Sequence, residues 1–173
     1  MEQMVLGGGC FWCVEGALLG LRGVTEVIPG YSGGHVENPT YEQVCGKRTG
    51  HAEVVRVAFE PDEISRSTLL EVFFTCHDPT QLNRQGNDVG PQYRSIVLYA
   101  DQGQREDALA AIEGLSEAFY DPIVTEVEPL EEFWVAEDHH HDYFANNPQN
   151  PYCRTVVSPK LAKVRAKFSH LYR

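Results

Sequence analysis

Three consecutive glycines near the N-terminus constrain the fold of this chain more than any other feature. Gly7-Gly8-Gly9 follows a short apolar run, Met4 to Leu6, and precedes apolar residues at helical spacing from Phe11 to Leu21. Glycines in such a run interrupt regular structure, because they favour turns over helices and strands. The segment therefore predicts a strand, a turn and then a helix, which ends at Gly23.

The rest of the chain continues this alternation. Apolar or alternating runs predict further strands at 24–31, 53–59, 95–99 and 124–127, and helical spacing predicts helices at 65–76 and 102–119. The order strand, helix, strand, strand, helix, strand matches the split βαβ arrangement. We expect an α+β fold, namely a ferredoxin-like two-layer α/β sandwich with a βαββαβ core, as a single domain over residues 1–173 with an irregular, loop-rich C-terminal extension.

Charge and hydropathy exclude several classes of function. Twenty-five acidic and 14 basic residues give a net charge of −11, which repels the phosphate backbone of nucleic acids. The sequence has no run of about 18 apolar residues that could span a membrane, and no basic, apolar leader at its start. We therefore expect a soluble protein, a monomer by default, that does not bind nucleic acid or membranes.

The cysteines point to thiol chemistry in a reducing compartment. Five cysteines, an odd number, favour free thiols in the cytoplasm over a disulfide framework. Only Cys10 and Cys13 have the short spacing of zinc ligands, and a zinc site usually needs a second such pair. The three histidines at 139–141 point in different directions on a helix, so they cannot converge on one ion. We expect no metal and no cofactor.

Cys10 lies where the glycine turn enters the predicted helix. Free N–H groups and the positive end of the helix dipole favour a thiolate at this position. For a cysteine taken at random, a small buried apolar side chain is the commoner role. The preceding glycines favour a nucleophile here, because they let a ligand approach the main chain closely.

Glu53 is the second unusual residue. Counting in steps of two places it on the same strand face as Val55, Val57 and Phe59. Burial on that face would raise its pKa and keep the carboxyl protonated near neutral pH, as a general acid requires. If the strand began one or two residues later, Glu53 would instead be solvated, and the sequence alone leaves both alternatives open.

Several motifs together carry a family resemblance. Gly8-Gly9-Cys10-Phe11-Trp12 closely resembles the signature of the MsrA class of methionine sulfoxide reductases. The resemblance extends over essentially the whole chain, in order and approximate spacing, through the segments 38–41, 49–53, 77–79, 84–88, 92–95 and 136–143. Agreement of several separate motifs is far more specific than a single Cys-x-x-Cys.

The resemblance implies a role for each site residue. Cys10 would attack the sulfoxide sulfur, and Glu53 would give a proton to the sulfoxide oxygen. Tyr41 and Tyr93 would donate hydrogen bonds to that oxygen, and Asp88 would orient the site. The remaining implied residues form an apolar pocket for the substrate methyl group: Phe11 and Trp12.

Reduction of the sulfoxide leaves a sulfenic acid on Cys10, which condenses with a second thiol. Cys153 is the first choice for this resolving cysteine, because the family resemblance implies resolvers in the tail. Cys13 is the second choice, since it stands where the family commonly has glycine and has the spacing of thioredoxin-like pairs. Cys45 and Cys76 have apolar, helix-like surroundings and are interpreted as packed thiols.

The main hypothesis is a cofactor-free enzyme that reduces the S epimer of methionine sulfoxide, free or in oxidised proteins, and is recycled by thioredoxin or a similar dithiol. A general thiol-disulfide oxidoreductase that uses Cys10 and Cys13 is one rival, although it has no use for Glu53 or the two tyrosines. A protein that binds methionine sulfoxide without turnover is another. Cys10 and Glu53 together argue against it.

Overall fold

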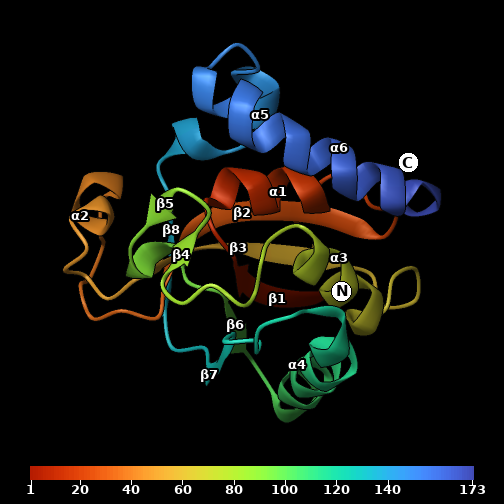
Figure 1. Cartoon of the computed structure of the whole chain (residues 1–173). Coiled ribbons are helices and arrows are strands. Elements are labelled where there is room, and N and C mark those ends of the chain that lie inside the picture. The colour runs from red at the N-terminus through yellow and green to blue at the C-terminus, as the bar shows by residue number, and fades with distance from the viewer.

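A six-stranded mixed sheet forms the centre of the computed structural model, which describes residues 1–173 (Figure 1). The strands lie in the order β7-β6-β1-β3-β2-β8, and only β6 and β7 run parallel. Their bounds are β1 Glu2–Gly7, β2 Val24–Ser32, β3 Ala52–Phe59, β6 Ile96–Tyr99, β7 Glu126–Pro129 and β8 Phe133–Val135. All the strands predicted from the sequence are present, and β8 is an additional edge strand. The fold is mixed α/β, as expected.

Four main helices pack around this sheet, together with short elements. The main helices are α1 Phe11–Leu18, α3 Arg66–Thr75, α4 Gln102–Leu115 and α6 Ser158–Lys167. The short elements are the helices α2 Tyr41–Cys45 and α5 Tyr143–Asn146, the two-stranded hairpin β4 Arg84–Gln85 and β5 Asp88–Val89, 3₁₀ turns at Pro91–Tyr93, Ser116–Ala118, Asp138–His140 and Ser169–Leu171, and a π-helix at Cys153–Val157. None of the helices is long and apolar enough to cross a membrane.

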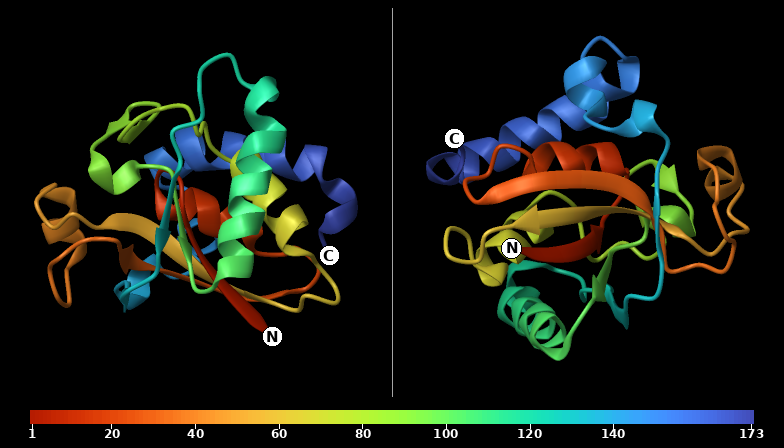
Figure 2. Two further views of the ribbon diagram at one scale, coloured as in Figure 1. Left: turned by 90° about the horizontal axis from the view of Figure 1, so that it is seen from below. Right: turned by 180° about the vertical axis from the view of Figure 1, so that it is seen from behind.

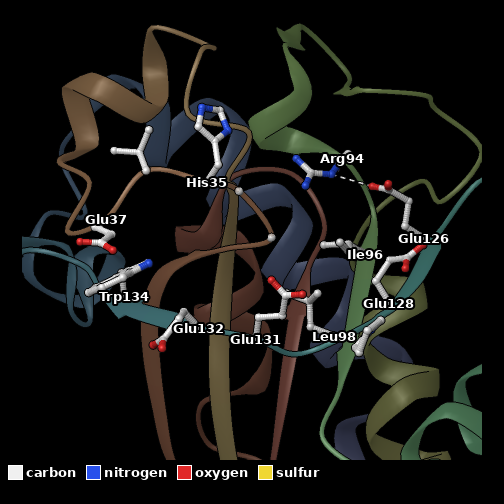
Figure 3. A pocket seen from close by; sticks show the side chains of 14 residues that line it. His35, Glu37, Arg94, Ile96, Leu98, Glu126, Glu128, Glu131, Glu132 and Trp134 are labelled. Carbon is white, nitrogen blue, oxygen red and sulfur yellow. Dashed lines mark hydrogen bonds and ion pairs between the residues drawn. The ribbon is translucent and has the colours of Figure 1, made fainter.

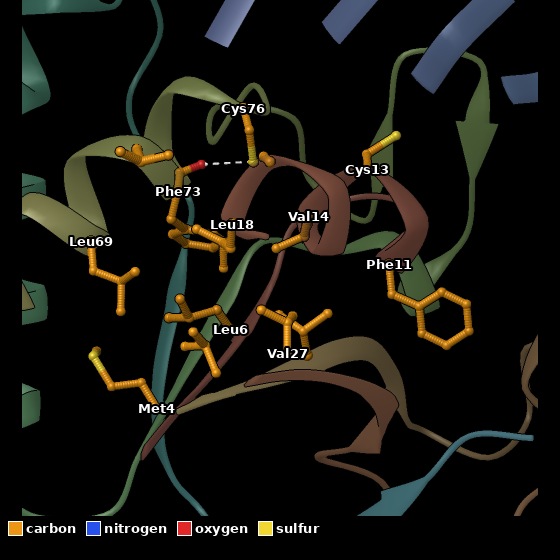
Figure 4. Packing of buried hydrophobic residues seen from close by; sticks show 14 of the residues in the cluster. Met4, Leu6, Phe11, Cys13, Val14, Leu18, Val27, Leu69, Phe73 and Cys76 are labelled. Atoms are coloured by element: carbon orange, nitrogen blue, oxygen red, sulfur yellow. Dashed lines mark hydrogen bonds between the residues drawn. The ribbon is translucent and has the colours of Figure 1, made fainter. Parts of the chain in front are cut away.

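The main core lies between the helices and one face of the sheet. Met4 and Leu6 of β1 lie in one buried cluster with Val14 and Leu18 of α1 and Phe73 of α3 (Figure 4). The opposite face carries a smaller cluster: Val5, Ala52, Val54, Ile96 and Leu98. The chain between β7 and β8 runs across that face, from one edge of the sheet to the other (Figure 2). The C-terminal segments α5 and α6 pack on α1, at the upper side of the molecule in Figure 1.

Several element boundaries differ from the sequence predictions. The first helix ends at Leu18 instead of Leu21, because Leu19 is extended and Gly20 turns the chain at φ +90°. The helix predicted at 102–119 ends at Leu115 and is followed by the 3₁₀ turn Ser116–Ala118. The segment between β2 and β3 contains α2, whose capping box joins the side chains and backbone of Thr40 and Gln43. The π-helix continues directly into α6, so Ser158 is the first residue of α6.

Each glycine of the turn before Cys10 faces another part of the protein. A Cβ on Gly7 would lie 2.8 Å from the Glu53 carbonyl oxygen, and a Cβ on Gly8 would lie 2.7 Å from the His77 ring. Gly9 has φ +83°, a conformation that favours glycine. The glycines let the chain pass between these groups. The need for glycine at these positions is therefore explained by crowding from the protein itself, whereas the sequence suggested the close approach of a ligand.

Candidate active site

Cys10 is placed by the junction of β1 and α1. It is the N-cap residue of α1, with extended backbone, and its side chain is free. The main-chain N–H of Gly9 donates to the carbonyl oxygen of Tyr93 at 3.1 Å, which fixes the turn against the segment that carries Tyr93. Only 4% of Cys10 is exposed. The thiol therefore lies just beneath the surface, at the start of a helix.

Glu53 lies on β3 with its side chain against the start of α1. Its Oε1 accepts a hydrogen bond from the main-chain N–H of Phe11 at 3.1 Å, while its Oε2 is buried without a partner. The residue is 1% exposed and shares a buried strand face with Val55, Val57 and Phe59, as the alternation predicted. The alternative of a solvated Glu53 is therefore wrong.

Burial raises the pKa of Glu53 to about 8. The charge of Asp88 adds to this increase, while the N–H of Phe11 and the nearby thiol of Cys10 oppose it. At neutral pH the carboxyl is therefore mostly protonated. Its Oε2 can then donate a proton that no protein group accepts.

The resting Cys10 is a thiol, and here the sequence-based expectation of a stabilised thiolate is wrong. Burial raises the pKa of Cys10 well above its ordinary value, and Glu53 and Cys13 raise it further when they are ionised. The main-chain N–H of Trp12 lowers it, which is the expected contribution of the helix start, but that contribution is smaller than the cost of burial. Cys10 therefore requires a change at the site, such as substrate binding, to react as a thiolate.

Tyr41 and Tyr93 lie beside this pair, although they come from different elements. Both are half-buried, and burial followed by the charge of Glu53 raises the pKa of each. Both phenols therefore keep their protons and can donate hydrogen bonds. Tyr41 begins α2 and Tyr93 ends the 3₁₀ turn after β5, so the connections before β3 and before β6 supply one tyrosine each.

Glu137 fixes the position of Tyr41. Its carboxylate accepts hydrogen bonds from the hydroxyl of Tyr31 at 2.9 Å and from the main-chain N–H of Tyr41 at 3.0 Å. Burial acts to raise the pKa of Glu137, but these donors lower it below its ordinary value. A charged carboxylate from the C-terminal extension thus holds the start of α2 against β2.

Asp88 is joined to the site by Tyr152, a residue that the sequence analysis did not assign. The Tyr152 hydroxyl donates a hydrogen bond to the Asp88 carboxylate, and the Tyr152 ring packs edge-on against Trp12 at 5.8 Å. The charge of Asp88 acts on both Cys10 and Glu53. Tyr152 could have been suspected from its position directly before Cys153, but a single tyrosine in a turn-rich tail carries no periodic signal.

Aromatic rings of the C-terminal extension pack around Trp12, the second residue of α1. The Trp12 ring stacks on Tyr143, with 3.9 Å between centroids and 7° between planes, and its indole N–H donates to His140. Trp12 is half-buried, whereas Phe11 is fully covered and packs against Tyr41 and His140. Trp12 is thus the accessible member of the predicted pocket pair. A direct contact of Phe11 with the substrate stays a prediction.

Two candidate resolving cysteines lie in the same buried cluster as Cys10. Cys13 is one helical turn along α1, and its N–H donates to the Cys10 carbonyl oxygen at 3.1 Å. Burial raises its pKa to about 11, and the charges of Glu53 and Cys153 are smaller contributors. Cys153 begins the π-helix that packs on α1 and is fully buried. The structure thus brings both thiols into the core around α1.

The other two cysteines differ from each other. Cys76 is buried, and its thiol donates to the Phe73 carbonyl oxygen at 3.1 Å, in agreement with a packed thiol (Figure 4). Cys45 is only half-buried. It ends α2, the short helix that Tyr41 begins, and is less packed than the sequence suggested.

A cavity of about 620 Å³ lies away from this site, on the sheet face crossed by the β7–β8 connection (Figure 3). Arg94 donates to Glu126 at its side, and further acids line it: Glu37, Glu128, Glu131 and Glu132. The acidic segment at 126–132 thus borders an open groove. Cys10, Glu53 and Tyr41 do not line it.

Comparison with known proteins assigns a family to this chain. The family model described as peptide methionine sulfoxide reductase matches residues 2–172. A relative from Natronomonas pharaonis, named peptide methionine sulfoxide reductase MsrA, is 60% identical over 166 residues, which cover 95% of this chain and 93% of the relative.

Two solved structures share the fold. Mxr1 from Saccharomyces cerevisiae in reduced form has a TM-score of 0.83 and 32% identity over 88% of each chain. Methionine sulfoxide reductase A of Corynebacterium diphtheriae has a TM-score of 0.77 and 36% identity, over 85% of this chain and 75% of that one. Sequence and structure therefore agree that this chain belongs to the peptide methionine sulfoxide reductase family.

Proposed function

We propose that this methionine sulfoxide reductase repairs oxidised proteins by reducing the S epimer of methionine sulfoxide, free or in proteins, with Cys10 as nucleophile and Glu53 as proton donor. One observation carries the assignment of the two residues. Beside the thiol of Cys10, the Oε2 of Glu53 is buried without a partner in a carboxyl whose pKa is raised to about 8. A general acid needs a protonated group with a free donor position, and Glu53 has both.

In the reductive step, the Cys10 sulfur attacks the sulfoxide sulfur while the sulfoxide oxygen takes the proton of Glu53. The oxygen is then transferred to Cys10, so that methionine leaves and Cys10 becomes a sulfenic acid. The substrate sulfur gains two electrons and the Cys10 sulfur loses two. The thiol proton of Cys10 restores the acid form of Glu53, so the step balances without a cofactor.

Tyr41 and Tyr93 support the same step by donating hydrogen bonds to the sulfoxide oxygen, where negative charge develops. Their raised pKa values keep them protonated beside Cys10 and Glu53. Asp88, held by Tyr152, orients the site through its charge. Trp12 supplies a half-buried aromatic face that contacts the methyl group, and the buried ring of Phe11 lies next to the Trp12 ring.

Cys153 is proposed to resolve the sulfenic acid. Its thiol displaces water from the Cys10 sulfenic acid and forms a disulfide, which thioredoxin or a similar dithiol then reduces by thiol-disulfide exchange. Its placement in the cluster that holds Cys10 supports this choice. Cys13 is the alternative, because it is one helical turn away from Cys10 on α1.

The decisive experiment measures turnover of each methionine sulfoxide epimer with dithiothreitol as reductant. The wild type is expected to reduce only the S epimer, and Cys10→Ser is expected to lose all activity, because its hydroxyl cannot attack the sulfur. A wild type that binds methionine sulfoxide without converting it would support a binding protein instead. Equal activity of both proteins would refute the role of Cys10.

The identity of the resolving cysteine requires a separate measurement. Protein oxidised with one equivalent of substrate is digested without reduction, and the disulfide-linked peptides are identified by mass spectrometry. We expect a Cys10–Cys153 linkage, and Cys153→Ser should stop after one turnover with thioredoxin. A Cys10–Cys13 linkage in the wild type would assign resolution to Cys13.

The scaffold is proposed to be ferredoxin-like. The order β6-β1-β3-β2, with antiparallel neighbours and α1 and α3 packed together, supports that assignment, with β7 and β8 as additions at the two edges. We also propose that the chain acts as a single catalytic domain, as a monomer, in the cytoplasm. The five free cysteines suit its reducing conditions.

A further inference from the structure

His140 is a buried group near the site whose hydrogen bonding is incomplete and whose role the proposed mechanism leaves open. It is 2% exposed and lies in the 3₁₀ turn Asp138–His140, whereas its neighbour His139 is exposed. Its Nε2 is buried and has no hydrogen-bond partner. Such a group is rare in a folded protein and often marks a place where another molecule completes the site.

The proton on the ring can be assigned from its other nitrogen. The indole nitrogen of Trp12 can only donate, and it lies 3.2 Å from Nδ1 of His140, so Nδ1 accepts. Burial, and after it the charge of His139, lower the pKa of His140 to about 4, so the ring is neutral at neutral pH. The single ring proton therefore sits on Nε2, which is a hydrogen-bond donor without an acceptor.

The surroundings of His140 provide mainly aromatic surface. The rings of Phe11, Trp12 and Tyr41 have their centroids 4.5–5.8 Å from that of His140. A buried donor without an acceptor costs about 1–3 kcal/mol. An oxygen atom that arrives with the substrate would remove this cost, so the unpaired N–H favours the bound state.

His140 packs on the two residues that follow Cys10 in the chain, with its ring centroid 5.2 Å from that of Phe11 and 5.8 Å from that of Trp12. When the sulfoxide group is at Cys10, the main chain of the substrate lies one side-chain length away. The ring packs on Trp12, the half-buried residue proposed to contact the substrate methyl group, so a bound peptide would pass close to His140.

We propose that the Nε2–H of His140 donates a hydrogen bond to a main-chain carbonyl oxygen of the peptide that carries methionine sulfoxide. This inference rests on the proposed function and extends it. It makes His140 a specificity residue that distinguishes peptide-bound methionine sulfoxide from small sulfoxides without an amide. Trp12 has two roles in this arrangement, as the wall of the pocket and as the donor that fixes the His140 tautomer.

The test compares two substrates, N-acetylmethionine-(S)-sulfoxide methylamide and methyl p-tolyl sulfoxide, which has no main-chain carbonyl. In His140→Phe, the ratio of kcat/KM for the amide to that for the small sulfoxide should fall about tenfold, the equivalent of one lost hydrogen bond. His140→Gln should largely restore the ratio, because its amide can accept from Trp12 and still donate. His139→Gln is the matched control, and its ratio should equal that of the wild type.

The outcomes separate the possible failures. If both substrates lose activity equally in His140→Phe, then His140 only positions Trp12 and the inference is wrong. Unchanged activity of His140→Phe with both substrates would also overturn it, because the Nε2–H would then bond to water alone. A wild type that turns over neither sulfoxide would refute the proposed function itself.

A direct measurement on the wild type avoids any folding defect of the variants. Nitrogen-15 NMR of the reduced protein should show His140 with its proton on Nε2. Addition of the product analogue N-acetylmethionine methylamide should move the Nε2 proton resonance downfield, whereas thioanisole, which lacks a carbonyl, should not. No shift with the amide would contradict the proposed contact.

Discussion

Two buried glutamates, one on α1 and one on the strand β3, show how the same side chain serves two different purposes. Glu15, on α1, is 1% exposed, and its carboxylate accepts from the main-chain N–H groups of Asp142 at 2.8 Å and Tyr143 at 3.3 Å. Glu53, on the sheet side, is equally buried but accepts only one N–H, at one oxygen. The two acids therefore differ in that the Oε2 of Glu53 has no hydrogen-bond partner, whereas both oxygens of Glu15 have one.

This difference separates a structural acid from a reactive one. Burial raises the pKa of Glu15 to about 7 and that of Glu53 to about 8, although two N–H donors oppose the increase at Glu15. Glu15 uses its oxygens to attach the C-terminal extension, including the Tyr143 that stacks on Trp12. Glu53 keeps one oxygen available. A raised pKa alone would not distinguish them, whereas the hydrogen-bond partners do.

The largest expected effect comes from removing the proton of Glu53. Glu53→Gln should slow the reductive step about 10²–10⁴-fold, the usual contribution of a general acid, because a neutral amide does not protonate the sulfoxide oxygen. Single-turnover kinetics with the S epimer measure this step without the resolving reaction. In the wild type the same rate should fall as the pH rises above about 8, where Glu53 loses its proton.

Glu15→Gln provides the matched control for that experiment, because it makes the same chemical change in the other buried acid. Its single-turnover rate should stay far above that of Glu53→Gln. If the two variants were equally slow, the free oxygen of Glu53 would not be the feature that matters, and the comparison between the two acids would fail.

A smaller effect is expected from loss of the attachment made by Glu15. Glu15→Ala leaves the N–H groups of Asp142 and Tyr143 without their acceptor, which should lower the free energy of unfolding by about 1–3 kcal/mol. Urea denaturation measures this change. Limited proteolysis should also cut the segment at 137–157 faster in this variant, and an unchanged cleavage rate would show that α5 is held by other contacts.

Much of this architecture could be predicted from local sequence patterns. The alternation from Glu53 to Phe59 placed the acid on the core face, and the glycine turn placed Cys10 at a helix start. Both features depend on residues close together in the chain, where side-chain periodicity is informative. The family resemblance then indicated Tyr41, Tyr93 and Asp88, which lie in irregular loops.

The contributions of distant segments could not be predicted in the same way. His140, Glu137 and Tyr152 reach the site only because the C-terminal extension folds over α1 and α2. Their contacts join residues about 60 to 130 positions apart, for which the sequence shows no periodic pattern. The protonated resting state of Cys10 was also missed, because the degree of burial follows from tertiary packing and outweighs the helix start.

The smallest expected effect tests whether Glu53 is held at a cost in stability. In the folded protein its pKa is about 8, above the ordinary value of 4.5, so the folded state retains a proton that the unfolded state releases. The contribution of the Glu53 carboxyl to the free energy of unfolding is therefore fully present below about pH 4.5 and is lost as the pH rises towards 8.

Glu53→Gln removes this pH-dependent contribution. Near pH 8.5 the free energy of unfolding of the variant should exceed that of the wild type by about 1–2 kcal/mol, since the unpaired amide hydrogens of the glutamine offset part of the benefit. At pH 5 the two proteins should differ little, because Glu53 is then neutral in the folded state and only partly ionised when unfolded. Chemical denaturation at the two pH values measures the difference, and Glu15→Gln should show a weaker pH dependence because its pKa is closer to the ordinary value. If Glu53→Gln were no more stable than the wild type at pH 8.5, the unpaired oxygen would be hydrated or bonded in solution, and Glu53 would be a satisfied acid like Glu15.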